Sequence, residues 1–387
     1  MTIVDWLITL IAFDTTSSKS NLELINHIAD WLSNYSIDPR LTFNDNAKKA
    51  NLFATLPAAN GKKAGGIILS GHTDVVPITD QAWTSDPFKA EIRDDKLFGR
   101  GACDMKGFIA VALSLLPKLQ QLNLSFPIHF AFSYDEEVGC LGAPLMIEDL
   151  QSLDYTPKAC IVGEPTNMYP IIAHKGINVF RCQIKGNPAH SSLTPKGCNA
   201  IEHAAQLILF LKNLASQFKE QQLDNDFDVP FTTLTTNLIQ GGTAHNIIPE
   251  FCEFVFEFRN LPDHAALSVK EQINGYITDY LLPKMQQEYP SAHINLSEVA
   301  SVTSFSADPD GKFVKLCQSI AGEQNLKKVA YATEAGLFQA AAIPTIVCGP
   351  GSIEQAHKAD EFVALQQLEK CRQFLLSLLA ESNQSFF

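Results

Sequence analysis

Short apolar runs alternate with amphipathic stretches through the first half of the chain. The apolar runs at residues 66–71, 128–133 and 159–163 are typical of buried strands. Residues 22–32 and 105–122 instead repeat their apolar positions at helical spacing. Strands that alternate with helices predict an α/β fold, in which helices flank a largely parallel central sheet.

The middle of the chain has a different pattern, which predicts a compact α+β insert. Its expected elements are strands at 179–185, 232–239 and 251–259 and helices at 199–220 and 264–280. The first pattern then resumes, with a helix at 311–321, a strand at 344–348 and a closing helix at 361–379. We therefore expect one split domain, residues 1–176 and 291–387, around an inserted domain, residues 177–290.

Composition narrows the class of protein. A chain of 387 residues exceeds the usual size of a single core, which agrees with two domains. The formal net charge of −13 argues against nucleic-acid binding, which requires a basic face. Residues 1–14 are apolar, but they include Asp5, lack a basic flank and are too short to cross a bilayer. We expect a helix packed on the core there and no membrane association.

Nine cysteines are scattered along the chain, and no CxxC pair occurs. An odd number of cysteines within apolar runs favours buried free thiols over a disulfide framework. This usage is typical of a reducing compartment, so we expect a cytoplasmic protein.

Three of the expected strands are followed directly by groups that can ligate a metal. His72, the run 135–137 and Glu164 each come at the end of one strand. Because chemistry in parallel sheets gathers at the carboxyl ends of the strands, we expect these groups at one edge.

Each of these motifs is ambiguous alone. His72 and Asp74 point to the same side of an extended segment, which suits a metal-bound imidazole oriented by a carboxylate, or a surface His–Asp pair. Asp104 follows a glycine-rich loop where a helix begins, so it is a helix cap or a carboxylate that bridges two metals. Cys103 beside it is expected to be a packed thiol.

The run Asp135-Glu136-Glu137 is either a solvated acidic loop or part of a site that binds metal cations. Burying three adjacent carboxylates without compensation would cost several kcal/mol each. In a metal site, one glutamate would be a ligand and its neighbour a general base. With Glu164 and His357, the set holds two imidazoles and three carboxylates, which suits zinc, with cobalt or manganese possible.

Together, these five segments resemble, in order, a di-zinc family of metallopeptidases that includes acetylornithine deacetylase, succinyl-diaminopimelate desuccinylase, aminoacylase and related carboxypeptidases. The resemblance implies two Zn²⁺ per subunit, with Co²⁺ possible. It implies that His72 and Glu164 hold one ion and Glu137 and His357 the other. Asp104 would bridge them. Asp74 would orient His72, and Glu136 would be the general base.

The resemblance also gives the insert a role, as a lid through which two subunits form a homodimer. His190 would stabilise the oxyanion in the partner's site, and Asn246 and Arg259 would contact substrate. From the residues alone, His190 fits a polar turn and Arg259 a strand-end charge.

Residues 173–176, 331–335 and 349–357 resemble the acetylornithine deacetylases more than the desuccinylases. We therefore expect a small acyl amino acid as substrate, namely N2-acetyl-L-ornithine in arginine biosynthesis. Glu334 would receive its side-chain ammonium or only support the His357 loop. Desuccinylase, aminoacylase and dipeptidase activities are the alternatives, with a catalytically silent metal-binding protein as one of another class. A phosphoesterase is disfavoured, because no phosphate-binding glycine loop is evident.

Overall fold

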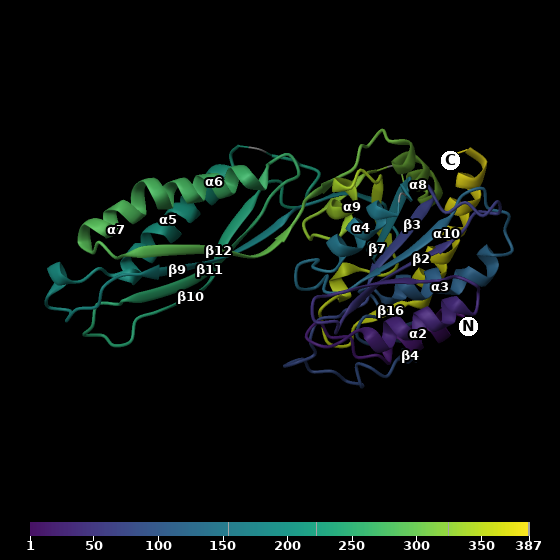
Figure 1. The fold of residues 1–387 in the computed structure, drawn as a ribbon, viewed down its shortest axis with the longest axis horizontal. Coiled ribbons are helices and arrows are strands. Elements are labelled where there is room, and N and C mark those ends of the chain that lie inside the picture. The colour runs from purple at the N-terminus through teal and green to yellow at the C-terminus, as the bar shows by residue number, and fades with distance from the viewer. Residues whose placement is uncertain (154, 222, 324, 386–387) are drawn as a thin grey trace. The chain divides into compact units, whose positions relative to one another are not determined.

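The computed structural model describes residues 1–153, 155–221, 223–323 and 325–385 (Figure 1). The chain divides into two compact units. The first unit comprises Met1–Ile172, Ser306–Lys327 and Thr333–Phe387, and the second comprises Ala173–Phe305 and Lys328–Ala332.

The first unit is built on a mixed sheet, which among the described residues has nine strands. Their order is β1-β2-β6-β3-β7-β15-β8-β13, with β14 paired to β8. The strands are β1 (Arg40–Phe43), β2 (Ala50–Leu56), β3 (Ile67–His72), β6 (Ile128–Ser133), β7 (Ala159–Pro165), β8 (Ile171–His174), β13 (Phe305–Ser306), β14 (Lys327–Val329) and β15 (Thr345–Gly349). The central run β6-β3-β7-β15 is parallel throughout. The predicted α/β class and its largely parallel sheet are confirmed.

Helices pack around this sheet and share its core. They are α1 (Ile3–Ile11), α2 (Leu22–Ser33), α3 (Lys106–Leu119), α4 (Ala143–Ser152), α8 (Lys312–Ala321), α9 (Ala335–Ala340) and α10 (Leu365–Ser385). Both α1 and α10 contact α3, which is buried along most of its length. Helix α1 begins with a capping box between Thr2 and Asp5 and buries Trp6, so the expected N-terminal helix on the core is confirmed.

A small second sheet in the first unit has the order β16-β5-β4. Its strands are β4 (Glu91–Arg93), β5 (Lys96–Phe98) and β16 (Phe362–Ala364). The closing helix therefore starts at Leu365 and not at residue 361. The physical reason is that residues 362–364 pair with β5 before the chain turns into α10.

The second unit is an antiparallel sheet of order β10-β11-β9-β12, with helices on one face (Figure 1). Its elements are β9 (Ile177–Lys185), α5 (Ala200–Phe218), β10 (Thr233–Gly241), β11 (Phe251–Arg259), α6 (Ala266–Tyr276), α7 (Leu282–Glu288) and β12 (His293–Val302). A π-helical turn, Ile277–Leu281, joins α6 to α7. Alternate residues of β11 enter the core, among them Phe254, Phe256 and Phe258.

This unit extends beyond the expected insert, 177–290. Strand β12 continues the sheet by pairing with β9, so the compact unit runs to Phe305. All nine cysteines are free and buried, which confirms the thiol prediction. Across the described residues, no helix is long and apolar enough to cross a membrane.

Candidate metal centre

His72 is the last residue of β3 and is almost fully buried. Its Nδ1 lies 2.9 Å from the backbone carbonyl of Asp74 and 3.6 Å from the Asp74 carboxylate. The nearer contact therefore orients the ring through the backbone. The Asp74 carboxylate instead accepts hydrogen bonds from the Ser17 hydroxyl and from the backbone N–H groups of Glu136 and Glu137. Asp74 thus links the β3 end to the turn after β6.

Asp104 lies between two imidazoles. Its Oδ1 is 3.0 Å from Nε2 of His72, and its Oδ2 is 3.2 Å from Nε2 of His357. Burial opposes ionisation of Asp104, but hydrogen bonds with His357 and His72 outweigh it and hold the pKa far below the usual range. A carboxylate with one oxygen directed at each imidazole is arranged to bridge two cations.

Glu361, a residue that the sequence analysis did not single out, holds the loop that carries Asp104. Its carboxylate accepts hydrogen bonds from the backbone N–H groups of Gly101, Cys103 and Asp104 at 2.8–3.0 Å. It also forms a buried ion pair with Arg100 at 2.8 Å. Glu361 directly precedes β16, so it lies at the start of a strand, whereas Glu136 and Glu137 follow the end of β6.

The three adjacent carboxylates after β6 have separate surroundings. Asp135 has a left-handed backbone conformation, with φ of 55°, and its side chain pairs with Lys49. Glu137 lies 3.0 Å from Nε2 of His357. Glu136 lies beside His72 and Glu164. The turn therefore gives the three neighbouring carboxylates different surroundings.

Glu164 lies within β7, 3.7 Å from Nε2 of His72. Gly163 precedes it, and a Cβ there would meet the Phe108 ring of α3 at 2.0 Å. Only glycine lets α3 approach β7 so closely, which places the helix after Asp104 directly against the strand that carries Glu164.

The centre holds more buried carboxylates than cations. Burial, followed by the neighbouring Asp104, raises the pKa of Glu137 to about 7 and that of Glu164 well above its usual value. Burial also raises the pKa of Glu136 strongly. A divalent cation would relieve this mutual repulsion.

The donor atoms are close enough to share ions. His72, Glu136 and Glu164 offer ligand atoms within 4.8 Å of one another, and so do His72, Asp104 and Glu137. The set consists of imidazole nitrogens and carboxylate oxygens, which fits zinc and related divalent ions. The nearby Cys103 thiol donates to the carbonyl of Ser352, so it is not a member of the set.

Glu334 caps the N-terminal end of α9 and is buried in the first unit. Burial raises its pKa to about 7. Its Oε1 has no hydrogen-bond partner among the described residues. An unpartnered buried carboxylate oxygen is able to receive a cationic group.

The three residues expected to contact substrate from the insert lie in the second unit. His190 is exposed and its Nδ1 lies 2.8 Å from the Ser192 hydroxyl. Asn246 is exposed on the neighbouring segment, where its backbone carbonyl accepts a hydrogen bond from the backbone N–H of Ser191. Arg259 ends β11 and pairs with Glu257 at 3.2 Å.

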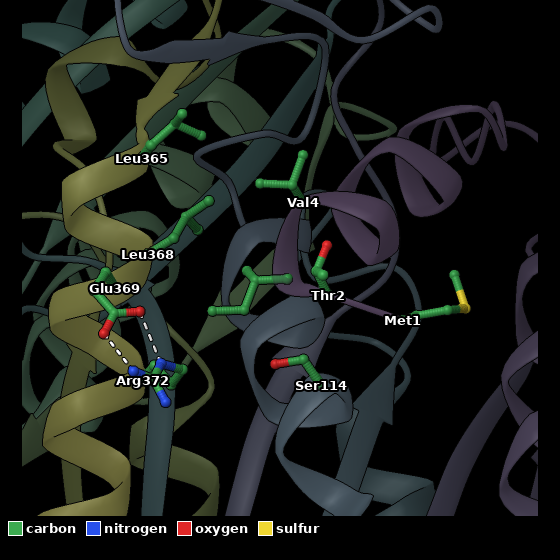
Figure 2. A pocket seen from close by; sticks show the side chains of 9 residues that line it. Met1, Thr2, Val4, Ser114, Leu365, Leu368, Glu369 and Arg372 are labelled. Atoms are coloured by element: carbon green, nitrogen blue, oxygen red, sulfur yellow. Dashed lines mark hydrogen bonds and ion pairs between the residues drawn. The ribbon is translucent and has the colours of Figure 1, made fainter.

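A separate pocket of about 370 Å³ lies beside α1, α3 and α10 (Figure 2). It is lined by Met1, Thr2, Ile3, Val4, Ser114, Leu365, Leu368, Glu369 and Arg372. Its lining is mainly apolar, with a Glu369–Arg372 ion pair on α10. Because it includes none of the candidate ligands, it is not the metal centre.

Buried carboxylates gathered with the buried His72 and the exposed His357 at the carboxyl edge of a parallel sheet are the arrangement of a metal-dependent hydrolase. Residues 68–381 match the family model of peptidase family M20/M25/M40. The chain is 35% identical over 370 residues to the acetylornithine deacetylase of Photorhabdus laumondii, which covers 95% of this chain and 92% of that one. It is also 35% identical to the acetylornithine deacetylase of Klebsiella pneumoniae, over 94% of this chain and 92% of that one. The chain belongs to the M20/M25/M40 peptidase family, and it is a metal-dependent hydrolase that acts on an amide bond.

Solved structures share the fold at lower identity. Aminopeptidase PepT from Bacillus cereus matches with a TM-score of 0.76 and 19% identity, over 98% of this chain and 97% of that one. A dinuclear metal-binding peptidase of the M20 family from Bacillus subtilis matches with a TM-score of 0.69 and 18% identity, over 99% and 98%. These likenesses confirm the fold class expected from the sequence.

Proposed function

We propose that this hydrolase deacetylates N2-acetyl-L-ornithine to ornithine and acetate, in arginine biosynthesis in the cytoplasm. One geometric observation supports a hydrolytic metal site in particular. The Asp104 carboxylate directs one oxygen to His72 and the other to His357, at 3.0 and 3.2 Å. The substrate is supported by the relatives at 32–35% identity that are named acetylornithine deacetylase.

The proposed ligands are the five residues that resemble those of the family. His72 and Glu164 would hold one Zn²⁺ and Glu137 and His357 the other, with Asp104 shared between them, and Co²⁺ would be able to replace zinc. Two such ions, when bound, polarise the scissile carbonyl and lower the pKa of an attacking water.

Side chains of the chain itself move the proton. Glu136 lies next to the ligands, where it accepts a proton from the attacking water and then passes it to the leaving amine. The Asp74 carboxylate accepts hydrogen bonds from the backbone N–H groups of Glu136 and Glu137, so it fixes the positions of the proposed base and the proposed ligand relative to each other. Glu334 offers a buried carboxylate to the side-chain ammonium of the substrate.

The second unit supplies the remaining groups in this proposal. The chain forms a homodimer through that unit, and His190 donates a hydrogen bond to the oxyanion in the partner's site. Asn246 and Arg259 bind the polar end of the substrate. The exposed position of His190 and Asn246 leaves both free to reach a ligand.

A substrate panel tests the proposed function. Purified protein is assayed for kcat/KM on N2-acetyl-L-ornithine, succinyl-diaminopimelate, acetylmethionine and dipeptides, with metal analysis of the same preparation. We expect acetylornithine to be the preferred substrate. A preference for another compound would change the assigned substrate but not the assigned reaction, amide hydrolysis. Bound metal without amidase activity would indicate a catalytically silent metal-binding protein.

A variant tests the role of Glu136. Glu136→Ala is expected to retain both metals and lose several orders of magnitude in kcat, on the order of 10³-fold or more. Glu148→Ala, at an exposed position on α4, is the matched control. Near-normal turnover in this variant would show that Glu136 is not the general base. Loss of metal from the variant would show that Glu136 is a metal ligand.

A further inference from the structure

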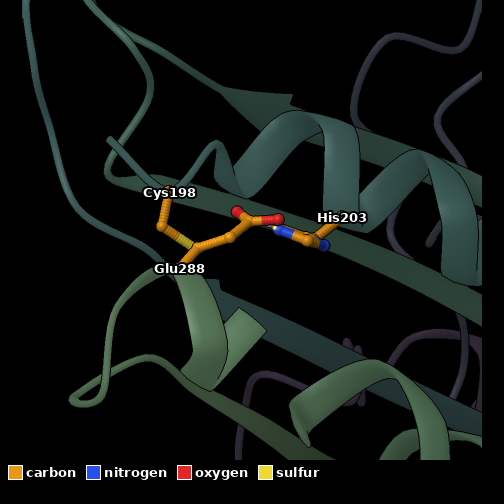
Figure 3. Close-up of side chains that lie close together, drawn as sticks. All are labelled: Cys198, His203 and Glu288. Atoms are coloured by element: carbon orange, nitrogen blue, oxygen red, sulfur yellow. Dashed lines mark hydrogen bonds and ion pairs between the residues drawn. The ribbon is translucent and has the colours of Figure 1, made fainter. Parts of the chain in front are cut away.

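A second cluster of metal-type donors lies within the second unit, and it has no role in the proposed hydrolysis. Cys198 is on the segment before α5, His203 is near the start of α5, and Glu288 is the last residue of α7 (Figure 3). Each offers one ligand atom, and these atoms all lie within 4.8 Å of one another. Residues far apart in the sequence therefore bring sulfur, nitrogen and oxygen donors to one point.

The contacts within the cluster are few. Nε2 of His203 lies 2.9 Å from Oε2 of Glu288, and the two side chains point at each other in Figure 3. The Cys198 thiol lies 3.9 Å from the carbonyl of Met285, which is a long contact even for sulfur. Among the described residues, no lysine or arginine pairs with Glu288.

Burial differs across the three groups. Cys198 is fully buried and His203 is 3% exposed, whereas the Glu288 side chain is 41% exposed. Burial, followed by the Glu288 carboxylate, raises the pKa of Cys198 to about 12. The Cys198 thiol and the Glu288 carboxylate thus lie together beside the His203 imidazole. The exposed side of Glu288 leaves a route for an ion from solvent.

Both the His203 ring and the Cys198 thiol contact the Glu288 carboxylate, so the three ligand atoms converge on one point. Thiolate, imidazole and carboxylate together form a donor set for zinc and similar borderline-soft ions, and they disfavour magnesium and calcium. We infer that Cys198, His203 and Glu288 bind a divalent ion of the zinc class, which ties the segment before α5 to the end of α7. Three protein ligands leave a fourth position for water.

Cobalt distinguishes this site from the catalytic centre. Full-length protein is stripped of metal by a chelator and titrated with Co²⁺, while the near-ultraviolet thiolate-to-cobalt charge-transfer band and the bound cobalt are measured. The proposed catalytic ligands are imidazoles and carboxylates, so only a cysteine ligand produces this band. We expect the band to appear and Zn²⁺ to abolish it.

Variants assign the band to the cluster. Cys198→Ser should lose the band and one equivalent of cobalt while it keeps amidase activity. Cys182→Ser, at another buried thiol of the same unit, should retain both. Glu288→Gln is the second test, because a half-exposed position tolerates the change. It should shift the titration to higher cobalt concentration.

The inference is overturned if saturating Co²⁺ gives no thiolate band, or if the band is unchanged in Cys198→Ser. It is also overturned if Glu288→Gln titrates like the wild type. Since the readout is a thiolate signal from the second unit, a failure of the proposed acetylornithine activity would leave this result unaffected.

Discussion

The carboxylate of Glu361 contributes no oxygen to the donor set, yet four N–H donors converge on it. Three are backbone groups in the loop that ends at Asp104, and the fourth is the buried Arg100 guanidinium. Removing a buried acceptor leaves these donors unsatisfied, at about 1–3 kcal/mol for each group. Glu361 is therefore a positioning residue for Asp104.

Glu361→Gln is the first prediction at the scale of a residue. The amide keeps the shape of the side chain but presents an N–H₂ group to donors that need an acceptor, so the Asp104 loop should loosen. We expect metal affinity and kcat/KM to fall by about 10–100-fold. Metal titration of chelator-treated protein and steady-state kinetics with added metal measure the two effects.

The matched control is Glu369→Gln, which loses an ion pair with Arg372 on α10. That pair is half-exposed, so the change should leave metal affinity and turnover near wild type. Equal metal affinity in the Glu361 and Glu369 variants would show that the loop holds its position without Glu361.

The sequence shows the candidate ligands of the metal centre more readily than the residues that hold those ligands in position. His72, Glu164 and the run after β6 are recognisable because each follows an apolar strand. Glu361 escaped notice because it was assigned to the start of a helix. Its role depends on β16 pairing with β5, a contact between segments far apart in the chain. The backbone contact between Asp74 and His72 was likewise not readable from alternation alone.

At the scale of elements, β6 carries the acidic turn at one end and a buried histidine near the other. Nδ1 of His129 lies 2.9 Å from the Thr55 hydroxyl, and Nε2 lies 2.7 Å from the carbonyl of Gly65. A neutral ring satisfies both contacts by donating from Nε2 and accepting at Nδ1. Burial lowers the pKa of His129 from 6.5 to about 4.

The lowered pKa of His129 predicts a loss of stability in acid. Between the folded value of about 4 and the unfolded value of 6.5, the unfolded chain binds a proton that the folded chain does not. The stabilisation is therefore complete above pH 6.5 and is lost as the pH falls towards 4. From about pH 7.5 to about pH 5, the wild type should lose about 2 kcal/mol more unfolding free energy than His129→Gln.

Denaturant unfolding of chelator-treated proteins at both pH values measures this difference, since protonation of the metal ligands affects both proteins alike. His293→Gln, at an exposed position on β12, controls for the loss of an imidazole. Parallel pH profiles for wild type and His129→Gln would contradict the prediction.

Elements with a clear period were predictable, and those defined by distant pairing were not. Strands β3, β6 and β7 lie where apolar runs indicated them. Strand β12 has no such run, because most of its side chains are exposed or half-buried and only its pairing with β9 defines it. The place of β12 in this sheet therefore depends on pairing that the apolar pattern does not show.

At the scale of the whole molecule, the second unit has an apolar edge. Strand β10 is the outer strand of its sheet, and Leu238 and Ile239 there are 67% and 58% exposed. Leu209 on α5, which contacts β10, is also exposed. Exposed apolar side chains on an outer strand, which pairs with a neighbour on one side, invite pairing with another strand, and this supports β10 as the contact of the proposed homodimer.

The last prediction concerns this edge. Replacing Leu238 and Ile239 together by lysine puts charge on the proposed contact and should convert the dimer to monomer, as measured by light scattering during size-exclusion chromatography. Val299→Lys, on the opposite edge strand β12, is exposed to a similar degree and should leave the mass unchanged. Because His190 is proposed to act in the partner's site, the monomer should lose activity on acetylornithine in proportion to its population. An active monomer would mean that His190 acts in the site of its own subunit. If the double lysine variant remains a dimer, the interface does not lie at β10.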